Sequence, residues 1–113
     1  MQDVAVPNSK YYFVHQLPTG VYHKIPRDLE QLKQVLTAEI DREVSRLLAP
    51  SDYRVIKALE TGEDMPQSWK TWRQTVRTQA KTAKTAIDSA VTVEELEQLH
   101  REPWAADPDT ISP

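Results

Sequence analysis

The sequence predicts a mainly α protein, in which an N-terminal β-hairpin is followed by two long and two short helices in one small α+β domain. Aromatic and β-branched residues gather near the N-terminus around a Pro-Thr-Gly turn signal, which is typical of a hairpin. Apolar residues then recur every three or four positions, which indicates amphipathic helices. Glycine occurs twice and proline eight times in 113 residues, so the helices are expected to be stiff and sharply bounded.

The hairpin is expected over residues 10–26. With the Pro-Thr-Gly segment as its loop, Phe13 faces Ile25 and His15 faces His23. An isolated hairpin is marginal in water, so this one is expected to pack on a helix or to pair its edge with another chain. Because alternate residues of a strand share a face, the two histidines lie on one face between four apolar side chains: Phe13, Leu17, Val21 and Ile25.

The first long helix is expected to begin with Pro26, which suits a first helical turn, and to stop at Pro50 after Ala49. At about 1.5 Å per residue it is roughly 30 Å long, the length of a packing spine or of one strand of a coiled coil. A short helix follows, with Ser51 as its N-cap and Gly62 as its left-handed C-terminal residue. The apolar stripe of the long helix consists of Leu29, Leu32, Leu36, Ile40, Val44 and Leu47.

The second long helix is expected to start at Asp64 and Gln67, which have the spacing of a capping box, and to end near Ala90. A second capping box at residues 92–95 begins the last short helix, which Pro103 ends. The apolar stripe of the long helix, large at one end and small at the other, consists of Trp69, Trp72, Val76, Ala80, Ala83 and Ile87.

These elements divide the chain into four parts. A polar, proline-bounded tail is normally mobile unless something holds it. We therefore expect another chain to hold the C-terminal tail of this protein. The parts are an N-terminal arm at 1–9, the hairpin at 10–26, a helical domain at 27–103 and an extended C-terminal tail at 104–113.

Composition argues against several classes of function. The net charge of −3 is not that of a general polyanion binder, and the chain has no cysteine for disulfides, thiolate nucleophiles or Cys-based zinc sites. Two glycines cannot supply a phosphate-binding loop, and no serine has the glycine flanks of a nucleophile elbow. No apolar run approaches the roughly 20 residues of a membrane span, and no secretory signal is recognisable. We therefore expect no enzyme activity, no cofactor and no membrane contact.

Two groups of side chains suggest a ligand. His15 and His23 face each other, but a metal site takes three or four ligands and no third one is near in sequence, so we expect no metal. A stripe of basic residues follows the first tryptophan of the second long helix. It either contacts a nucleic-acid backbone, or is a solvated helix face, or meets the acidic face of a partner helix. The overall acidity argues against nucleic acid. The basic stripe consists of Lys70, Arg73, Arg77, Lys81 and Lys84.

Trp69, Trp72 and Trp104 either fill the core or face a partner, since tryptophan is enriched in interface hot spots. We expect at least one of them, Trp104 on the tail, to face a partner.

The middle of the chain carries a run of motifs. The matching residues are Ile40, Arg42, Arg46, Leu47, Leu48, Ala49, Ser51, Asp52, Tyr53, Trp69, Trp72, Arg73, Val76, Arg77, Pro103 and Trp104. This run resembles the tail assembly chaperone-like domain of tailed bacteriophages, whose pattern is an arginine-rich helix, L-L-A-x-S-D-W, W-x-x-[YW]-R-x-x-L-R and a Pro-Trp ending. The resemblance covers 40–77 and 103–104. It departs from the pattern at Pro50, Tyr53 and Val76, and by a longer insertion between Arg77 and Pro103. The motif marks either packing within the chain or a contact with a partner.

The N-terminal region carries a second resemblance. Its Y-Y-F, T-G-V-Y and I-P-R-D segments, between residues 11 and 28, resemble the opening of tail-fibre assembly proteins. Together the resemblances imply a non-enzymatic protein that binds a tail-fibre, baseplate or other tail protein in the host cytoplasm during assembly, and then leaves or stays in the virion tail.

Two other functions stay open, a stoichiometric structural part of the fibre or baseplate and a small helical nucleic-acid-binding or regulatory protein. Nucleic acid is the less expected partner, and a homo-oligomer through the long helices is a further alternative. The side chains expected at the partner interface are Tyr12, Tyr22, Tyr53, Trp69, Trp72, Arg73, Arg77 and Trp104.

Overall fold

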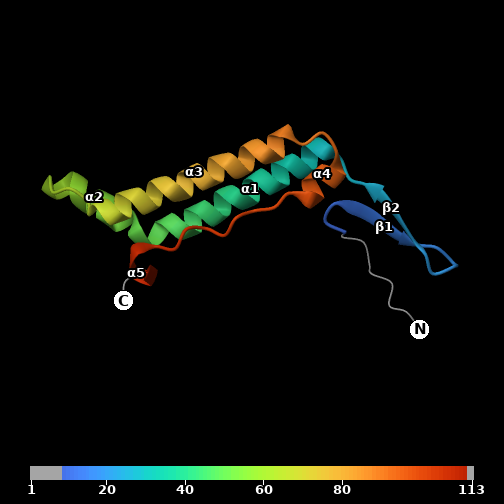
Figure 1. The fold of residues 1–113 in the computed structure, drawn as a ribbon, viewed down its shortest axis with the longest axis horizontal. Coiled ribbons are helices and arrows are strands. Elements are labelled where there is room, and N and C mark those ends of the chain that lie inside the picture. Colours follow the sequence, from blue (N-terminus) through green and yellow to red (C-terminus); the bar gives the residue numbers. More distant parts are fainter. Residues whose placement is uncertain (1–8, 112–113) are drawn as a thin grey trace.

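The computed structural model describes residues 9–111 and is mainly α with an N-terminal hairpin, as expected (Figure 1). The expected arm therefore lies outside the described residues except for Ser9, as do the last two residues of the tail. The described elements are β1 Tyr12–Gln16, β2 Tyr22–Pro26, α1 Leu29–Leu48, the 3₁₀ turn η1 Ala49–Ser51, α2 Asp52–Thr61, α3 Gln67–Ser89, α4 Val93–Gln98 and α5 Pro108–Ile111.

The molecule is elongated, measuring 68 × 32 × 18 Å with a radius of gyration of 20.0 Å. A compact chain of this length has a radius of gyration of about 13 Å. Figure 1 shows why: α1 and α3 form an antiparallel pair, while α2 and the hairpin extend beyond opposite ends of that pair. An extended shape leaves more side chains at the surface than a compact fold of equal length would.

The spine of the fold is the pairing of α1 with α3 within the chain. The helix predicted to begin at Pro26 starts later, because Pro26 ends β2 and the Asp28 carboxylate accepts a hydrogen bond from the Gln31 amide at 3.0 Å. The predicted stripe faces the core, and a smaller cluster of Leu48, Trp72 and Val76 fills the far end. The main core cluster consists of Tyr12, Leu32, Leu36, Ile40, Ala80, Ile87, Ala90, Val93 and Leu96.

The two predicted capping boxes have different outcomes. Thr92 caps α4 by accepting a hydrogen bond from the Glu95 amide at 3.1 Å, which confirms the second box. The first is wrong: Pro66 occupies the N-cap of α3, no side chain caps that helix, and Asp64 forms an ion pair with Lys70 at 3.6 Å instead. Gly62 ends α2 in the left-handed conformation with φ 73°, as predicted.

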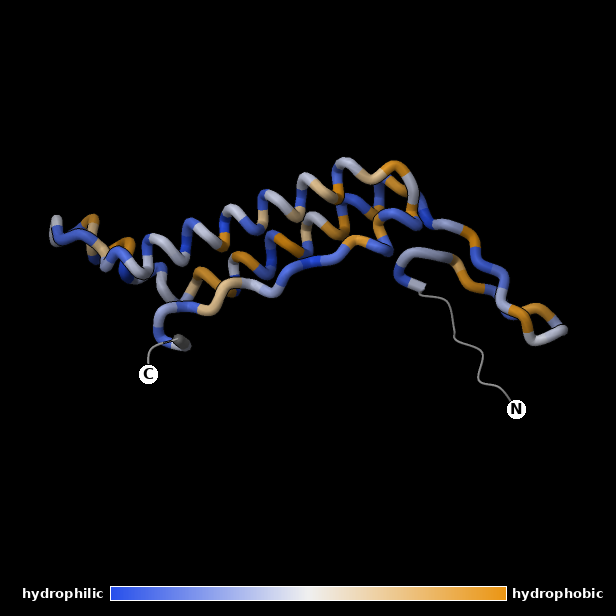
Figure 2. Tube along the Cα trace, viewed as in Figure 1, coloured by the Kyte–Doolittle hydropathy of each residue, from blue (hydrophilic) through white to orange (hydrophobic). Residues whose placement is uncertain are grey.

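The hairpin has the predicted register, with Phe13 paired to Ile25 and His15 to His23. It packs on the helices, but through the other face. Tyr12, which is 1% exposed, and half-buried Val14 contact the main core cluster. The predicted apolar face is therefore open to solvent, and the apolar segments of the hairpin lie beyond the helices in Figure 2.

The described part of the C-terminal tail contacts the helical pair of its own chain. Residues 99–107, here called the strap, run back along the helical pair (Figure 1). The Gln79 amide donates to the Pro103 carbonyl at 3.0 Å and accepts from the Ala105 N–H at 3.0 Å. The Trp72 indole N–H donates to the Ala105 carbonyl at 2.8 Å. Beyond the strap, the described residues end in α5, a single turn whose Thr110 N–H donates to the Asp107 carboxylate at 2.8 Å.

Candidate functional site

Half of the side chains expected at a partner interface meet where α1 ends and α3 begins. We call Tyr53, Arg54, Trp69, Trp72 and Arg73 the aromatic corner. The rings of Trp69 and Trp72 meet edge to face, with centroids 5.7 Å apart. The Arg54 guanidinium lies 4.5 Å from the Trp69 ring centroid and 5.1 Å from that of Tyr53, so it bridges α2 to α3 by cation–π contacts.

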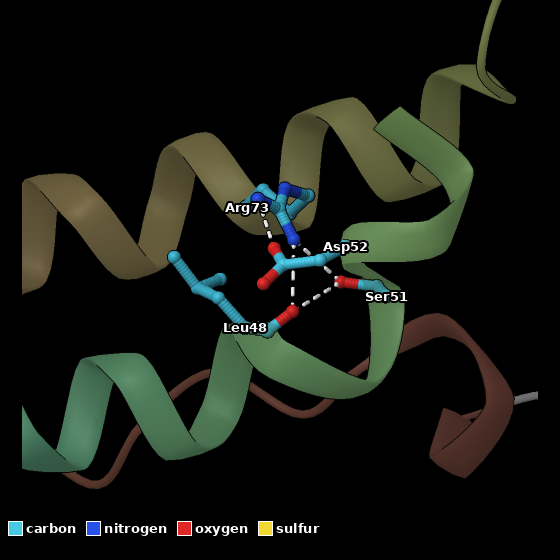
Figure 3. Close-up of polar contacts among 4 residues, drawn as sticks. All are labelled: Leu48, Ser51, Asp52 and Arg73. Carbon is cyan, nitrogen blue, oxygen red and sulfur yellow. Dashed lines mark hydrogen bonds and ion pairs between the residues drawn. The ribbon is translucent and has the colours of Figure 1, made fainter. Parts of the chain in front are cut away.

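Arg73 joins three elements at this corner (Figure 3). Its Nη1 donates to the Leu48 carbonyl at 3.0 Å and to the Ser51 hydroxyl at 2.7 Å, and its Nη2 donates to an Asp52 carboxylate oxygen at 2.9 Å. The Ser51 hydroxyl itself donates to the Leu48 carbonyl at 3.1 Å. Because Leu48 is the last residue of α1, its carbonyl has no partner within the helix, and Arg73 supplies one.

This contact explains the L-L-A-x-S-D and W-R motifs in structural terms. Ser51 and Asp52 lie between α1 and α2, while Arg73 lies on α3, and the fold brings all three together. Ser51 is the N-cap of α2 as predicted, but its side chain makes no capping hydrogen bond, because it is engaged with Arg73 and Leu48. The structure therefore gives Ser51, Asp52 and Arg73 of the motif a packing role within the chain.

The outward side of α2 beside this joint is apolar. Leu59 is 81% exposed, Ile56 and Tyr53 are also exposed, and α2 has no buried residue at all. Tyr53, Ile56 and Leu59 follow each other at intervals of three, so they lie along one side of the helix. We call these three side chains the α2 stripe.

The other expected interface residues lie elsewhere. Tyr12 belongs to the core, Tyr22 is half-buried on the hairpin, and Arg77 is exposed on α3. Trp104 is half-buried on the strap, packs against both core clusters, and has the Arg101 guanidinium 5.3 Å from its ring centroid. Trp72 is only 6% exposed and fills the smaller cluster. Of the expected interface residues, Tyr53 and Arg77 are thus exposed, and Trp69 at the aromatic corner is half-buried.

Sequence reasoning missed Arg54, Ile56 and Leu59 as surface candidates. Ile56 and Leu59 lie at helical spacing in a short helix, where apolar residues usually face a core, so the sequence gives no sign that they are exposed. Arg54 was not singled out, although its place next to Tyr53 was visible. Its buried Nε has no hydrogen-bond partner within residues 9–111, which agrees with a role in stacking between rings.

The basic stripe of α3 is largely neutralised by acidic residues of the same chain. Lys70 pairs with Asp64, Arg73 with Asp52 at 2.9 Å, and Lys84 with Asp41 at 2.8 Å. Arg77 and Lys81 border a shallow depression between α1 and α3 that also contains Asp41 and Asp88. Three of the five basic side chains are thus paired with acids of the same chain, and of these acids only Asp41 lies on α1.

A cavity of about 440 Å³ lies between the helical pair and the strap. Its floor is apolar and includes Leu36, Ile40, Ile87 and Leu96, whereas Thr78 and Gln79 border it on the α3 side. Nearby, burial and then the charges of Glu97 and Glu94 raise the pKa of Tyr12, whose hydroxyl has no hydrogen-bond partner in the described structure. The cavity is large enough to hold a small apolar group.

Residues 9–111 contain no group of three or more histidine, aspartate or glutamate side chains placed to hold a metal ion. Within the same range, none of the helices combines the length and the apolar character needed to cross a membrane. No protein-family model, curated protein or solved structure matches the chain.

Proposed function

We propose that this chain is a non-enzymatic accessory protein of a bacteriophage tail or tail fibre, which binds a fibre, baseplate or other tail protein and assists or completes its assembly. The observation that carries the proposal is the α2 stripe, an exposed apolar surface mounted on a joint made from the residues of the resemblance. Since no relative was found, support comes from these residues and from the surface itself.

The exposure of the α2 stripe supports binding of a protein. Burying apolar surface contributes about 25 cal/mol for each Å² removed from water. Leu59 is 81% exposed, and Tyr53 and Ile56 are more than half exposed. Contiguous exposed apolar patches commonly mark protein–protein contacts. A partner that covers all three side chains therefore gains several kcal/mol before the costs of association are subtracted.

The rigidity of the joint supports the same role. Arg73 holds the α1–α2 corner to α3 with hydrogen bonds to Leu48, Ser51 and Asp52, and Arg54 is stacked between two rings. A surface that is already in its bound conformation loses less conformational entropy on association. The position of α2 beyond the end of the helical pair leaves its outward side open to a large partner (Figure 1).

Cross-linking and quantitative mass spectrometry of particles and infected cells test the proposal. Lys57 lies on α2 and Lys24 on the hairpin, and both are exposed, so they are matched reporters for the two ends of the molecule. We expect cross-links from Lys57 to a tail or fibre protein. Cross-links from Lys24 alone would contradict the placement of the interface, and the absence of any tail or fibre partner would contradict the function.

The same data separate an assembly factor from a structural component. A fixed copy number per purified particle, matching the symmetry of the tail, identifies a part that stays in the virion. Absence from particles, together with misassembled fibres when the gene is deleted, identifies a factor that leaves after assembly.

A further inference from the structure

The outward face of the hairpin has a regular composition. Three residue pairs follow each other along it: Phe13 with Ile25, His15 with His23, and Leu17 with Val21. The central pair consists of histidines and both outer pairs are apolar, so the face has the same pattern when read from either end. All six side chains are exposed.

The histidine pair could supply two of the four ligands that a tetrahedral metal site needs. Residues directly opposite each other in an antiparallel pair have Cβ atoms about 4.5–5.5 Å apart, which lets two imidazoles reach one ion at about 2.0–2.1 Å each. A tetrahedral zinc site takes four ligands. The described chain places no third histidine, aspartate or glutamate beside this pair, so a closed site needs ligands from outside the chain.

We infer that two copies of this chain pair through their hairpin faces and bind one zinc-class divalent ion between the four imidazoles of His15 and His23. A two-fold axis across the strands at the histidine level superposes histidines on histidines. It also sets Phe13 and Ile25 of each copy against Leu17 and Val21 of the other. The six facing side chains of each copy then make apolar contacts or bind the metal, while Arg27 lies at one end of the face.

The charge at one end of the face selects this arrangement. The Arg27 guanidinium lies 4.2 Å from the Phe13 ring centroid, at the end of the face that is far from the turn. An axis across the strands places the two guanidiniums at opposite ends of the interface, whereas an axis along the strands would bring them together. The same axis directs the two helical pairs away from each other, since the hairpin extends beyond the helices (Figure 1).

The interface is too small to hold the dimer without the ion. A standard interface buries about 800 Å² on each partner and involves roughly 20–30 residues a side, whereas this face has six side chains. We therefore expect a monomer without metal and a dimer with it. The α2 stripe lies at the opposite end of the molecule and stays free in this dimer, so the inference stands or falls independently of the proposed function.

Titration of the metal-free chain with Zn²⁺ tests the inference, with calorimetry for stoichiometry and sedimentation velocity for mass. We expect one ion per two chains and a doubling of mass. His15→Gln and His23→Gln each weaken zinc binding by at least about tenfold and prevent the doubling. His100→Gln is the matched control, because His100 is the third histidine, is exposed and lies beyond α4.

Phe13→Ser separates the two parts of the inference, because it keeps both ligands and removes an exposed apolar contact. We expect it to weaken dimerisation while the histidine variants keep wild-type circular dichroism. One ion per chain without a change of mass overturns the role of the second copy. Zinc binding that survives His15→Gln, or is lost in His100→Gln, overturns the site, as does the absence of zinc binding to the wild-type chain.

Discussion

Replacement of Arg73 tests whether the motif residues hold the fold together. In Arg73→Ala the Leu48 carbonyl and the Ser51 hydroxyl lose a charged donor, and Asp52 loses its ion pair. A hydrogen bond to a charged group contributes about 1.5–3 kcal/mol. The Arg73 side chain is 11% exposed, so its bonds to Leu48 and Ser51 are well shielded from water. The Asp52 side chain is 56% exposed, so the ion pair adds at most about 1 kcal/mol.

We therefore expect Arg73→Ala to lower the free energy of unfolding by about 3 kcal/mol, since bonds that share one group do not add fully. Asp52→Asn should cost less than about 1 kcal/mol. Arg73→Lys should lie between them, because an ammonium keeps the charge but not the planar fork. Urea unfolding followed by circular dichroism measures these differences as shifts of midpoint at constant slope.

Arg77→Ala is the matched control, because Arg77 lies one turn further along α3, is exposed, and has no ion pair among the described residues. We expect it to change the free energy of unfolding by less than about 0.5 kcal/mol. Equal effects of Arg73→Ala and Arg77→Ala would refute the assignment of Arg73 as a joint.

The strap and the buried tyrosine give two further predictions. Gln79→Ala removes two of the three hydrogen bonds described above between the strap and α3, and leaves the one from Trp72. Tryptic cleavage after Arg101 should therefore accelerate and the Ala105 amide should exchange faster, whereas Gln74→Ala, exposed on the same helix, should change neither. Tyr12→Phe removes a buried hydroxyl without a partner, so stability at neutral pH should be unchanged or higher by up to about 1 kcal/mol. Because burial raises the pKa of Tyr12 in the folded chain, its hydroxyl ionises in the unfolded chain first as pH rises above about 10. Wild-type stability should therefore fall there more steeply than that of Tyr12→Phe, and equal slopes in urea unfolding against pH would contradict this.

The hairpin register was predictable because it depends on local information. The position of the turn and the two-residue period of a strand determine which residues pair, and Phe13 pairs with Ile25 as expected. Which face packs on the helices depends on tertiary structure. The large Tyr12 side chain reaches the core from the face with fewer apolar residues, so the number of apolar side chains on a face does not show which face packs.

Helix boundaries show the same limit on a smaller scale. The Thr92 cap was predictable because its hydrogen bond spans three residues. Asp64 has the same spacing to Gln67, but Pro66 is held in an extended conformation at the N-cap, so the helix begins after it and Asp64 is too far away. Pro26 was placed in a helix because proline suits a first turn, although it equally suits the end of an edge strand.

The joint could be assembled only from the structure. Ser51, Asp52 and Arg73 were all part of the motif, but their separation of about twenty residues gives no sign that they touch. The strap was equally hidden, because its contacts with Gln79 and Trp72 use backbone groups that no side-chain pattern reveals. Polar contacts between distant segments are specified by the fold, and sequence periodicity does not contain them.

Binding of the purified chain to the tail and fibre proteins of its own phage tests the central claim most directly. Leu59→Ser should weaken binding about tenfold or more, since burying a leucine contributes about 1.5–3 kcal/mol. Val35→Ser, an exposed apolar residue on α1, is the control and should bind like the wild-type chain. Affinity should change little between about 50 and 200 mM salt, whereas phosphate contacts would lose it steeply. Binding that Leu59→Ser leaves intact, or a steeply salt-dependent affinity for nucleic acid with none for any tail protein, would contradict the account.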